Sequence, residues 1–193
     1  MKLHFIHGIH PDPPGGTIAN LEPYFLSYNR QIHNYGSAYA VTSRFLNPRR
    51  ASKIAESVCN NDILIGHSNG CTIANMISWK QPVFGMVLIN PALDCDTVFG
   101  PCEWIDVYFN PGDEAVPWSK FLWHHPWGTI GRDGYVGEFE PRLTNINGWN
   151  PPVDWLPIVN GHGALFHWPC LDSWARYIRS RIDDHIKRFA GTS

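Results

Sequence analysis

The sequence predicts an α/β fold of three layers, in which a mostly parallel, six-stranded sheet carries helices on both faces. Strand-like runs alternate with helix-like segments through most of the chain, an order that places strands side by side in parallel. Residues 85–89 form a continuous apolar run, which is typical of a strand buried on both faces. The chain has 193 residues, 44% of them hydrophobic and 17% charged, so it can form one domain with its own core.

The first half begins with an alternating run that ends at His7-Gly8, before a loop rich in proline and glycine. Such a loop can be neither a helix nor a central strand. Hydrophobic periodicity predicts strands at residues 2–6 and 36–42, and helices at residues 17–31 and 51–58.

The second half continues the alternation with a strand at residues 63–65 and a helix that includes residues 73–77. Three more strands and a long amphipathic helix follow, predicted at residues 85–89, 104–109, 155–159 and 171–189. Residues 118–152 break this alternation. We expect them to be a tryptophan-rich insertion within a single domain that spans residues 1–193.

Charge and composition argue against several classes of protein. The net charge is −2 and no basic block is present, which argues against nucleic acid or an acidic membrane as a partner. The N-terminus lacks the apolar length of a signal peptide, and no run approaches the length of a membrane span. The five cysteines are odd in number and show no C-x-x-C spacing, which favours free thiols, although Cys95 and Cys102 could form one bridge. We therefore expect a soluble, cytoplasmic protein.

The most informative stretch is residues 66–70, which read GHSNG between the predicted strand and helix. Strand, sharp turn and helix are the setting of a G-x-S-x-G nucleophile elbow. A serine at the tip of this turn needs a strained backbone and small neighbours, and Gly66 and Gly70 supply them. Ser68 is thus the candidate nucleophile, and a simple glycine-rich turn is the alternative.

A serine nucleophile needs a base, and the base needs an orienting carboxylate. In α/β sheets both are expected on loops at the carboxyl ends of strands. Asp113 follows the strand at 104–109 and is the candidate acid; its rivals are Glu114 and the pair Asp94 and Asp96.

The candidate base is His162, which follows the strand predicted at 155–159 and has a glycine on each side. His167 is its rival. An oxyanion formed on the substrate would need two backbone donors, and we expect these to be the N–H groups of Asn69 and Ile9.

These motifs together resemble the α/β-hydrolase family. The matching pieces are His7-Gly8, the elbow around Ser68, Gly112-Asp113 and Gly161-His162, in the family's order of Ser, Asp and His. The resemblance implies a minimal α/β-hydrolase fold and hydrolysis through an acyl-enzyme, without a metal or organic cofactor. It also shows departures: the family's two leading strands and its usual cap have no counterpart here, and the insertion lies between the acid and the base.

The predicted activity is cleavage of an acyl ester bond of a small-molecule substrate. An amidase, a thioesterase or an acyltransferase would use the same three groups, and a non-catalytic binding protein with a hydrolase fold is the alternative of another class. The candidate substrate-binding residues are His7, Trp118 and Trp123; the tryptophans would line the site as a lid or, equally well, form a satellite core.

His124-His125, with His167 or His10 as a further ligand, is a possible metal site. The sequence contains no metal-ligand spacing such as H-E-x-x-H, and no G-x-G-x-x-G follows a strand. We therefore expect no metal and no nucleotide cofactor.

Overall fold

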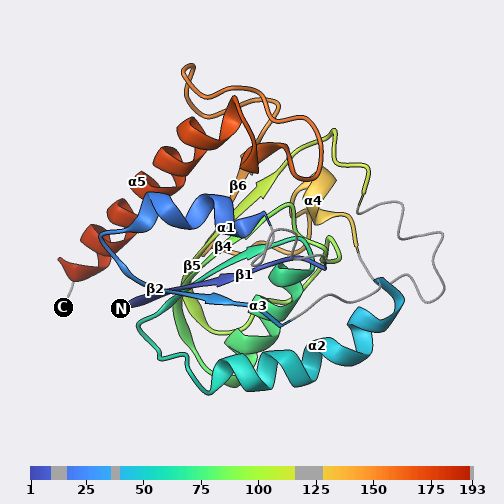
Figure 1. Ribbon diagram of the computed structural model, residues 1–193, viewed down its shortest axis with the longest axis vertical. Helices are drawn as coiled ribbons and strands as arrows, with labels where there is room; N and C mark the ends of the chain where they lie inside the picture. The colour runs from blue at the N-terminus through green and yellow to red at the C-terminus, as the bar shows by residue number, and fades with distance from the viewer. Residues whose placement is uncertain (10–16, 36–39, 116–127, 192–193) are drawn as a thin grey trace.

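A computed structural model describes residues 1–9, 17–35, 40–115 and 128–191 (Figure 1). In this part of the chain six strands form one sheet in the order β2-β1-β3-β4-β5-β6, and every neighbouring pair is parallel. The strands are β1 Lys2–Ile6, β2 Asn29–His33, β3 Ile63–His67, β4 Val83–Ile89, β5 Cys102–Phe109 and β6 Leu143–Asn147. The predicted parallel, six-stranded sheet is confirmed.

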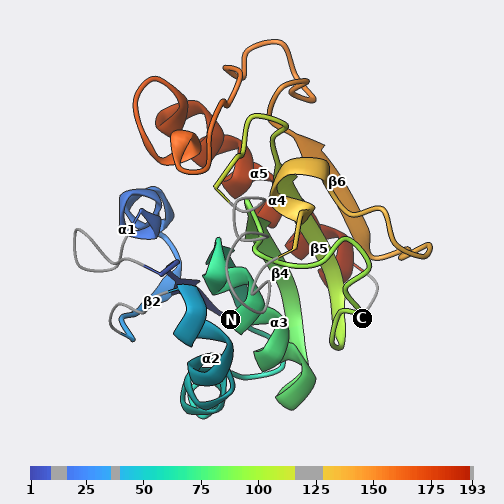
Figure 2. The same cartoon turned by 90° about the vertical axis from the view of Figure 1, so that its right-hand side faces the viewer.

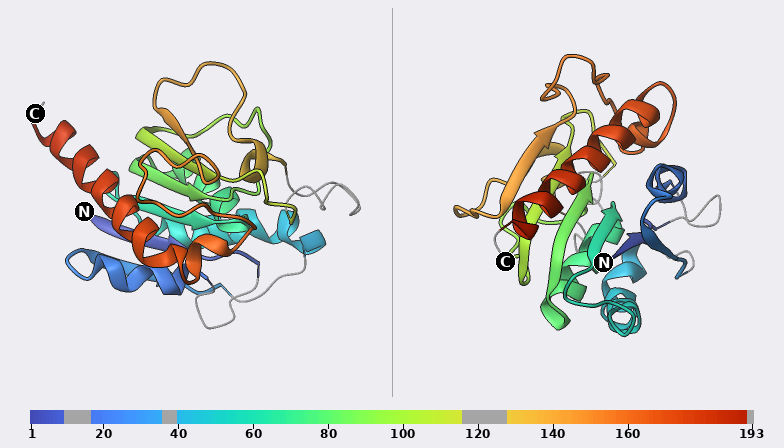
Figure 3. Two further views of the ribbon diagram at one scale, coloured as in Figure 1. Left: turned by 90° about the horizontal axis from the view of Figure 1, so that it is seen from above. Right: turned by 90° about the vertical axis from the view of Figure 1, so that its left-hand side faces the viewer.

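Helices cover both faces of the sheet (Figures 2 and 3). They are α1 Ile18–Leu21, η1 Glu22–Phe25, α2 Ala40–Ala55, α3 Asn69–Lys80, α4 Ile130–Asp133, η3 Ala164–Phe166 and α5 Cys170–Ala190. Alternate strand residues face opposite layers. In β3, Ile63 and Ile65 pack in the core that contains α1 and α5, whereas Leu64 packs in the core that contains α2 and α3.

The predicted elements between residues 17 and 42 were wrong. Residues 18–25 form only the short helices α1 and η1, Pro23 lies in the first turn of η1, and the next strand is β2 at residues 29–33 rather than 36–42. The reason is that β2 is an edge strand whose residues, NRQIH, are mostly polar and at least partly exposed. Its sequence therefore carries little of the hydrophobic signal that identifies a strand.

The strand predicted at 155–159 was also wrong, because the sheet ends at β6, residues 143–147. The apolar run at 155–159 is a loop, in which Leu156 and Val159 are buried and the Val159 N–H donates to the Gly148 carbonyl. Residues 128–152, part of the predicted insertion, therefore contribute α4 and an edge strand. Residues 116–127, which include Trp118 and Trp123, lie outside the described part.

No helix within the described residues is long and apolar enough to cross a membrane. The carboxyl ends of β1, β3, β4 and β5 lie at one edge of the sheet, because these strands are parallel neighbours. Chain segments that are far apart in sequence therefore meet at this edge, and the candidate site is built there.

Candidate active site

Ser68 lies at the turn between β3 and α3 with backbone angles φ 54° and ψ −124°. A positive φ costs a serine about 1–3 kcal/mol, and the surrounding backbone holds it in place. The Ser68 N–H donates to the Ile89 carbonyl (3.0 Å), and the Ser68 carbonyl accepts from the N–H groups of Cys71 (3.0 Å) and Ala92 (3.2 Å). The strained turn expected of an elbow is therefore present.

The two glycines of the elbow are required by close backbone contacts. A Cβ on Gly66 would lie 2.9 Å from the Cα of Cys71, and a Cβ on Gly70 would lie 2.2 Å from the Ile6 carbonyl oxygen. Because both obstacles are backbone, they cannot rotate away as a side chain could. Glycine is thus the residue that lets β3, the turn and α3 pack this closely against β1.

Asp113 and His162 meet at the same edge of the sheet. Nδ1 of His162 lies 2.8 Å from Oδ2 of Asp113, which is fully buried, while the imidazole is 22% exposed. A carboxylate only accepts hydrogen bonds, so the proton of a neutral His162 sits on Nδ1. Nε2 is then left with a lone pair that can accept a proton from another group.

The structure adds Asn90, at the end of β4, to the groups around the acid. Its Nδ2 donates to Asp113 Oδ2 (3.1 Å) and to the Gly131 carbonyl (3.3 Å), and its backbone takes a positive φ of 45°. The Ala115 N–H donates to the other carboxylate oxygen, Oδ1 (3.1 Å). Sequence reasoning missed this role, because an asparagine before a proline after a strand is also typical of an ordinary strand end.

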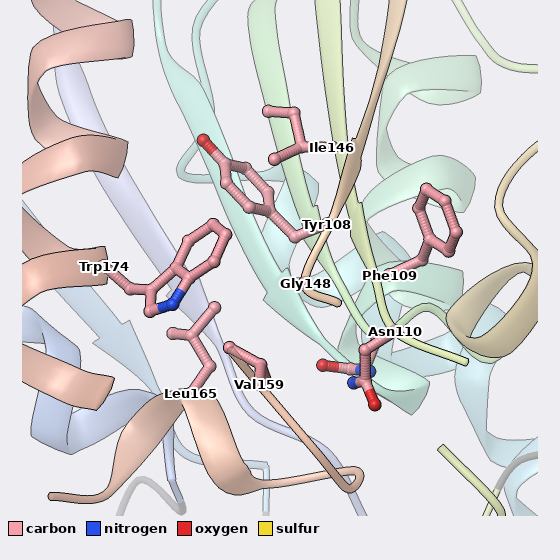
Figure 4. Close-up of a pocket in the computed structure, with 9 residues that line it drawn as sticks. Tyr108, Phe109, Asn110, Ile146, Gly148, Val159, Leu165 and Trp174 are labelled. Atoms are coloured by element: carbon pink, nitrogen blue, oxygen red, sulfur yellow. The ribbon is translucent and has the colours of Figure 1, made fainter. Parts of the chain in front are cut away.

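Asn110, at the end of β5, joins the loop of the acid to the loop of the base. Its amide donates to the Gly161 carbonyl (3.3 Å) and its Oδ1 accepts from the Gly161 N–H (3.1 Å). Gly161 has a φ of 110°, a conformation that favours glycine. A small cavity of about 10 Å³ lies beside Asn110 and is lined in part by Tyr108, Leu165 and Trp174 (Figure 4).

His67, the residue before Ser68, contacts His162, the candidate base, directly. Its Nε2 lies 3.1 Å from the His162 carbonyl oxygen and its Nδ1 lies 2.8 Å from Thr17 Oγ1. Because a carbonyl only accepts, Nε2 carries the proton and Nδ1 accepts from the threonine hydroxyl. Burial lowers the pKa of His67 well below its ordinary value, so the ring stays neutral. Apart from the place of His67 in the G-x-S-x-G motif, no sequence pattern predicts this contact.

The first loop of the chain passes beside Ser68. A Cβ on Gly8 would lie 3.2 Å from the Cβ of Ser68, which brings the next residue, Ile9, to the edge of the site. Asn69 begins α3, and its side chain exchanges two hydrogen bonds with that of Asn47 (2.7 and 3.1 Å). The Asn47–Asn69 pair holds the start of α3, whose first N–H group is one of the two predicted oxyanion donors.

The ring of His7 is fully buried under this loop. It stacks on Tyr35 at 3.9 Å between ring centroids, and its Nδ1 lies 2.6 Å from the Gly8 carbonyl oxygen. The Tyr35 hydroxyl donates to the Gly8 carbonyl (2.8 Å) and contacts that of His7. His7 therefore holds the shape of the loop, and a direct contact with substrate stays a prediction.

The rival residues are all on the surface. Glu114, Asp94, Asp96 and His167 are exposed, whereas Asp113 is buried against His162.

All five cysteines are free thiols. Within the described residues, no group of three or more His, Cys, Asp and Glu side chains could hold a metal ion. His10, His124 and His125, the other members of the metal hypothesis, lie outside that part of the chain.

No protein-family model matches the chain, and no curated protein matches it in sequence. Solved structures do match its fold. One is the α/β hydrolase domain-containing protein 10 from mouse, with a TM-score of 0.59 and 15% identity over 95% of this chain and 90% of that chain.

Two microbial structures give similar results. A protein from Xanthomonas campestris, described as a hydrolase of the α/β superfamily, has a TM-score of 0.52 and 16% identity over 93% of this chain and 98% of its own. A protein from Thermoplasma acidophilum, described as a CIB-like hydrolase, has a TM-score of 0.52 and 13% identity over 95% of this chain and 86% of its own. At these identities the likeness is one of architecture, and the chain therefore has the α/β-hydrolase fold.

Proposed function

We propose that the protein is a serine hydrolase that cleaves an acyl ester bond of a small molecule through an acyl-enzyme intermediate. The observation that carries this proposal is the 2.8 Å contact between His162 Nδ1 and the buried carboxylate of Asp113. The His162 carbonyl also contacts His67, the residue before Ser68 in the strained elbow. A charge buried this deeply is costly unless it is paired. The pair leaves Nε2 of His162 unprotonated and near the solvent. In this form Nε2 can act as the base that a serine nucleophile requires.

The first half of the proposed reaction forms the acyl-enzyme. Ser68 Oγ attacks the carbonyl carbon of the ester while His162 Nε2 takes the hydroxyl proton. The N–H groups of Asn69 and Ile9 stabilise the negative oxygen that results. The intermediate then collapses, the C–O bond of the ester breaks, and the alcohol leaves with the proton from His162.

The second half releases the acid. Water attacks the acyl-enzyme, His162 takes its proton, and the carboxylic acid departs as the proton returns to Ser68. Asp113 holds the imidazole in the Nδ1–H tautomer and stabilises the imidazolium formed in each half. His67 and Asn110 contribute by fixing the backbone that carries His162.

Fluorophosphonate labelling and ester hydrolysis test the proposal. The wild type should be labelled once, on Ser68, and Ser68→Ala should lose the label and about 10³-fold or more of the rate on short-chain p-nitrophenyl esters. Ser180→Ala removes an exposed hydroxyl on α5 and is the matched control, with an expected rate equal to that of the wild type. A wild type that takes no label and hydrolyses no ester would instead support a binding protein.

A second panel separates the related acyl-transfer activities. Esters, thioesters and amides with the same acyl group compare the leaving groups, and added alcohol or amine acceptors detect acyl transfer. An ester hydrolase should turn over the ester fastest, and product formation should not rise with the acceptor. Faster turnover of the amide or thioester, or a rise with acceptor, would assign the same three residues to that other reaction.

A further inference from the structure

A groove runs between the edge strand β2 and the helix α2, and none of Ser68, Asp113 and His162 lines it. Its volume is about 580 Å³, which lies in the range of small-molecule sites. Gln31, Asn34 and Tyr35 line it from the β2 segment, and Arg49, Arg50 and Lys53 line it from α2. Figure 2 shows β2 at the edge of the sheet with α2 beside it.

The lining of the groove is positively charged, although the chain as a whole has a net charge of −2. Three of the side chains that line the groove are cationic. Glu56 is the one acidic residue in the part of this lining that the structure describes. Within the described residues, neither Arg49 nor Lys53 forms a salt bridge. These two are four residues apart on α2 and so project from the same face of the helix. The like charges of Arg49 and Lys53 repel each other, and an anion between them would reduce that repulsion.

Arg50 is held in place by Tyr35. Its guanidinium carbon lies 4.5 Å from the centroid of the Tyr35 ring, within the range of a cation–π contact. The Tyr35 hydroxyl in turn donates to the Gly8 carbonyl in the loop beside Ser68. The ring is therefore anchored at its far end, and the guanidinium is positioned before any ligand arrives, which lowers the entropic cost of binding.

We propose that this groove binds a small molecule that carries phosphate or carboxylate groups, at a site separate from Ser68. Arginine forks bind the oxygens of either group through paired hydrogen bonds, and Lys53 adds a third cation. The opposite wall is lined by the neutral polar residues Gln31 and Asn34. Tyr35 lines the groove, and its hydroxyl contacts the loop that borders Ser68. The ligand and Ser68 would therefore lie on opposite sides of this loop.

Calorimetric titration of the full chain with inorganic pyrophosphate, and separately with citrate, tests the proposal at a constant ionic strength of about 0.15 M. Either anion should bind, and the tighter one identifies whether phosphate or carboxylate is preferred. The double variant Arg49→Gln/Lys53→Gln should weaken that binding about tenfold or more, since two charge-assisted hydrogen bonds are lost. Its melting temperature and circular dichroism verify that it is folded.

A matched double variant separates a specific site from general attraction. Lys80→Gln/Lys187→Gln removes the same charge from exposed positions outside the groove and should leave the dissociation constant within about twofold of the wild type. Equal weakening by both double variants would overturn the proposal, as would the absence of binding by either anion below about 10 mM.

Binding to Ser68→Ala keeps this test independent of the proposed hydrolase activity. The variant should bind the anion as the wild type does, because Ser68 does not line the groove. Loss of binding in Ser68→Ala would place the anion at the elbow and contradict a separate site. A wild type without esterase activity that binds the anion normally would support the groove and count against the hydrolase alone.

Discussion

Replacement of Asp113 by asparagine tests how the acid acts on the base. Among the hydrogen bonds that the carboxylate accepts are three from donors in the described residues: His162 Nδ1 and Asn90 Nδ2 contact Oδ2, and the Ala115 N–H contacts Oδ1. An asparagine has one oxygen and one NH₂ group at these two positions. In either orientation, the NH₂ group faces at least one donor, so the variant cannot satisfy all three contacts.

The orientation that keeps the Ala115 contact has the larger chemical effect. The NH₂ group then faces His162 Nδ1, which must accept, so the proton of the imidazole moves to Nε2 and the base is lost. Loss of the correct tautomer reduces the rate of a serine triad by about 10⁴-fold. The donor of Asn90 also loses its acceptor on Asp113, which costs about 1–3 kcal/mol of folding stability.

Initial rates on a short-chain ester, the rate of fluorophosphonate labelling and urea unfolding measure these effects. Glu114→Gln is the matched control, because it makes the same chemical change at the exposed neighbour and should keep the wild-type rate. If Asp113→Asn kept the rate within about tenfold of the wild type, or if both variants lost it equally, the assignment of Asp113 as the orienting acid would be refuted.

Three further predictions concern stability and the supporting contacts. Burial lowers the pKa of His33 to about 4 and also lowers the pKa of His4, with which His33 is paired. The unfolded chain therefore binds more protons than the folded protein. The free energy of unfolding should fall by about 3 kcal/mol from His33 alone as the pH drops from about 6.5 to 4. Urea unfolding across this range should show the loss, and His33→Gln should reduce its slope. Gly70→Ala should destabilise the fold by about 1–3 kcal/mol, because the new Cβ would lie 2.2 Å from the Ile6 carbonyl oxygen. Gly163→Ala is the control: the nearest atom to a Cβ there is 3.9 Å away, so this variant should melt within a few degrees of the wild type. Thr17→Val removes the hydroxyl at His67 Nδ1 and should cost about 0.5–1.5 kcal/mol; an unchanged melting temperature would contradict that hydrogen bond.

The sequence predicted the central strands better than the edges of the sheet. Strands β3 and β4 are buried on both faces, so their residues form apolar runs that are visible without a structure. The edge strands β2 and β6, with sequences NRQIH and LTNIN, have one open side and need few apolar residues. The loop at 155–159 was mistaken for a strand because Leu156 and Val159 are buried as a strand's residues would be.

The candidate site shows a similar division. Ser68, Asp113 and His162 could be proposed from the sequence because each lies within two residues of a glycine, and glycine marks turns in any sequence. Asn90 and Asn110 hold the same loops by side-chain hydrogen bonds. Their partners are 23 and 51 residues away, a separation at which local sequence patterns carry no information. The structure was needed to identify them.

The position of the acid is fixed by three separate segments. Asn90 bonds to Asp113 from β4, Asn110 joins the loops of acid and base from β5, and Gly131 in α4 leaves the space that Asp113 occupies, since a Cβ there would lie 2.9 Å from Oδ2. These contacts come from the sheet and from α4. Trp123, proposed from the sequence as a substrate-binding residue, should therefore affect substrate preference more than the geometry of Asp113 and His162. A swap of Trp123 to alanine should shift the profile of esters by acyl length and leave the labelling rate of a small fluorophosphonate nearly unchanged; an equal loss on all esters and on the label would show that Trp123 also supports the reacting groups.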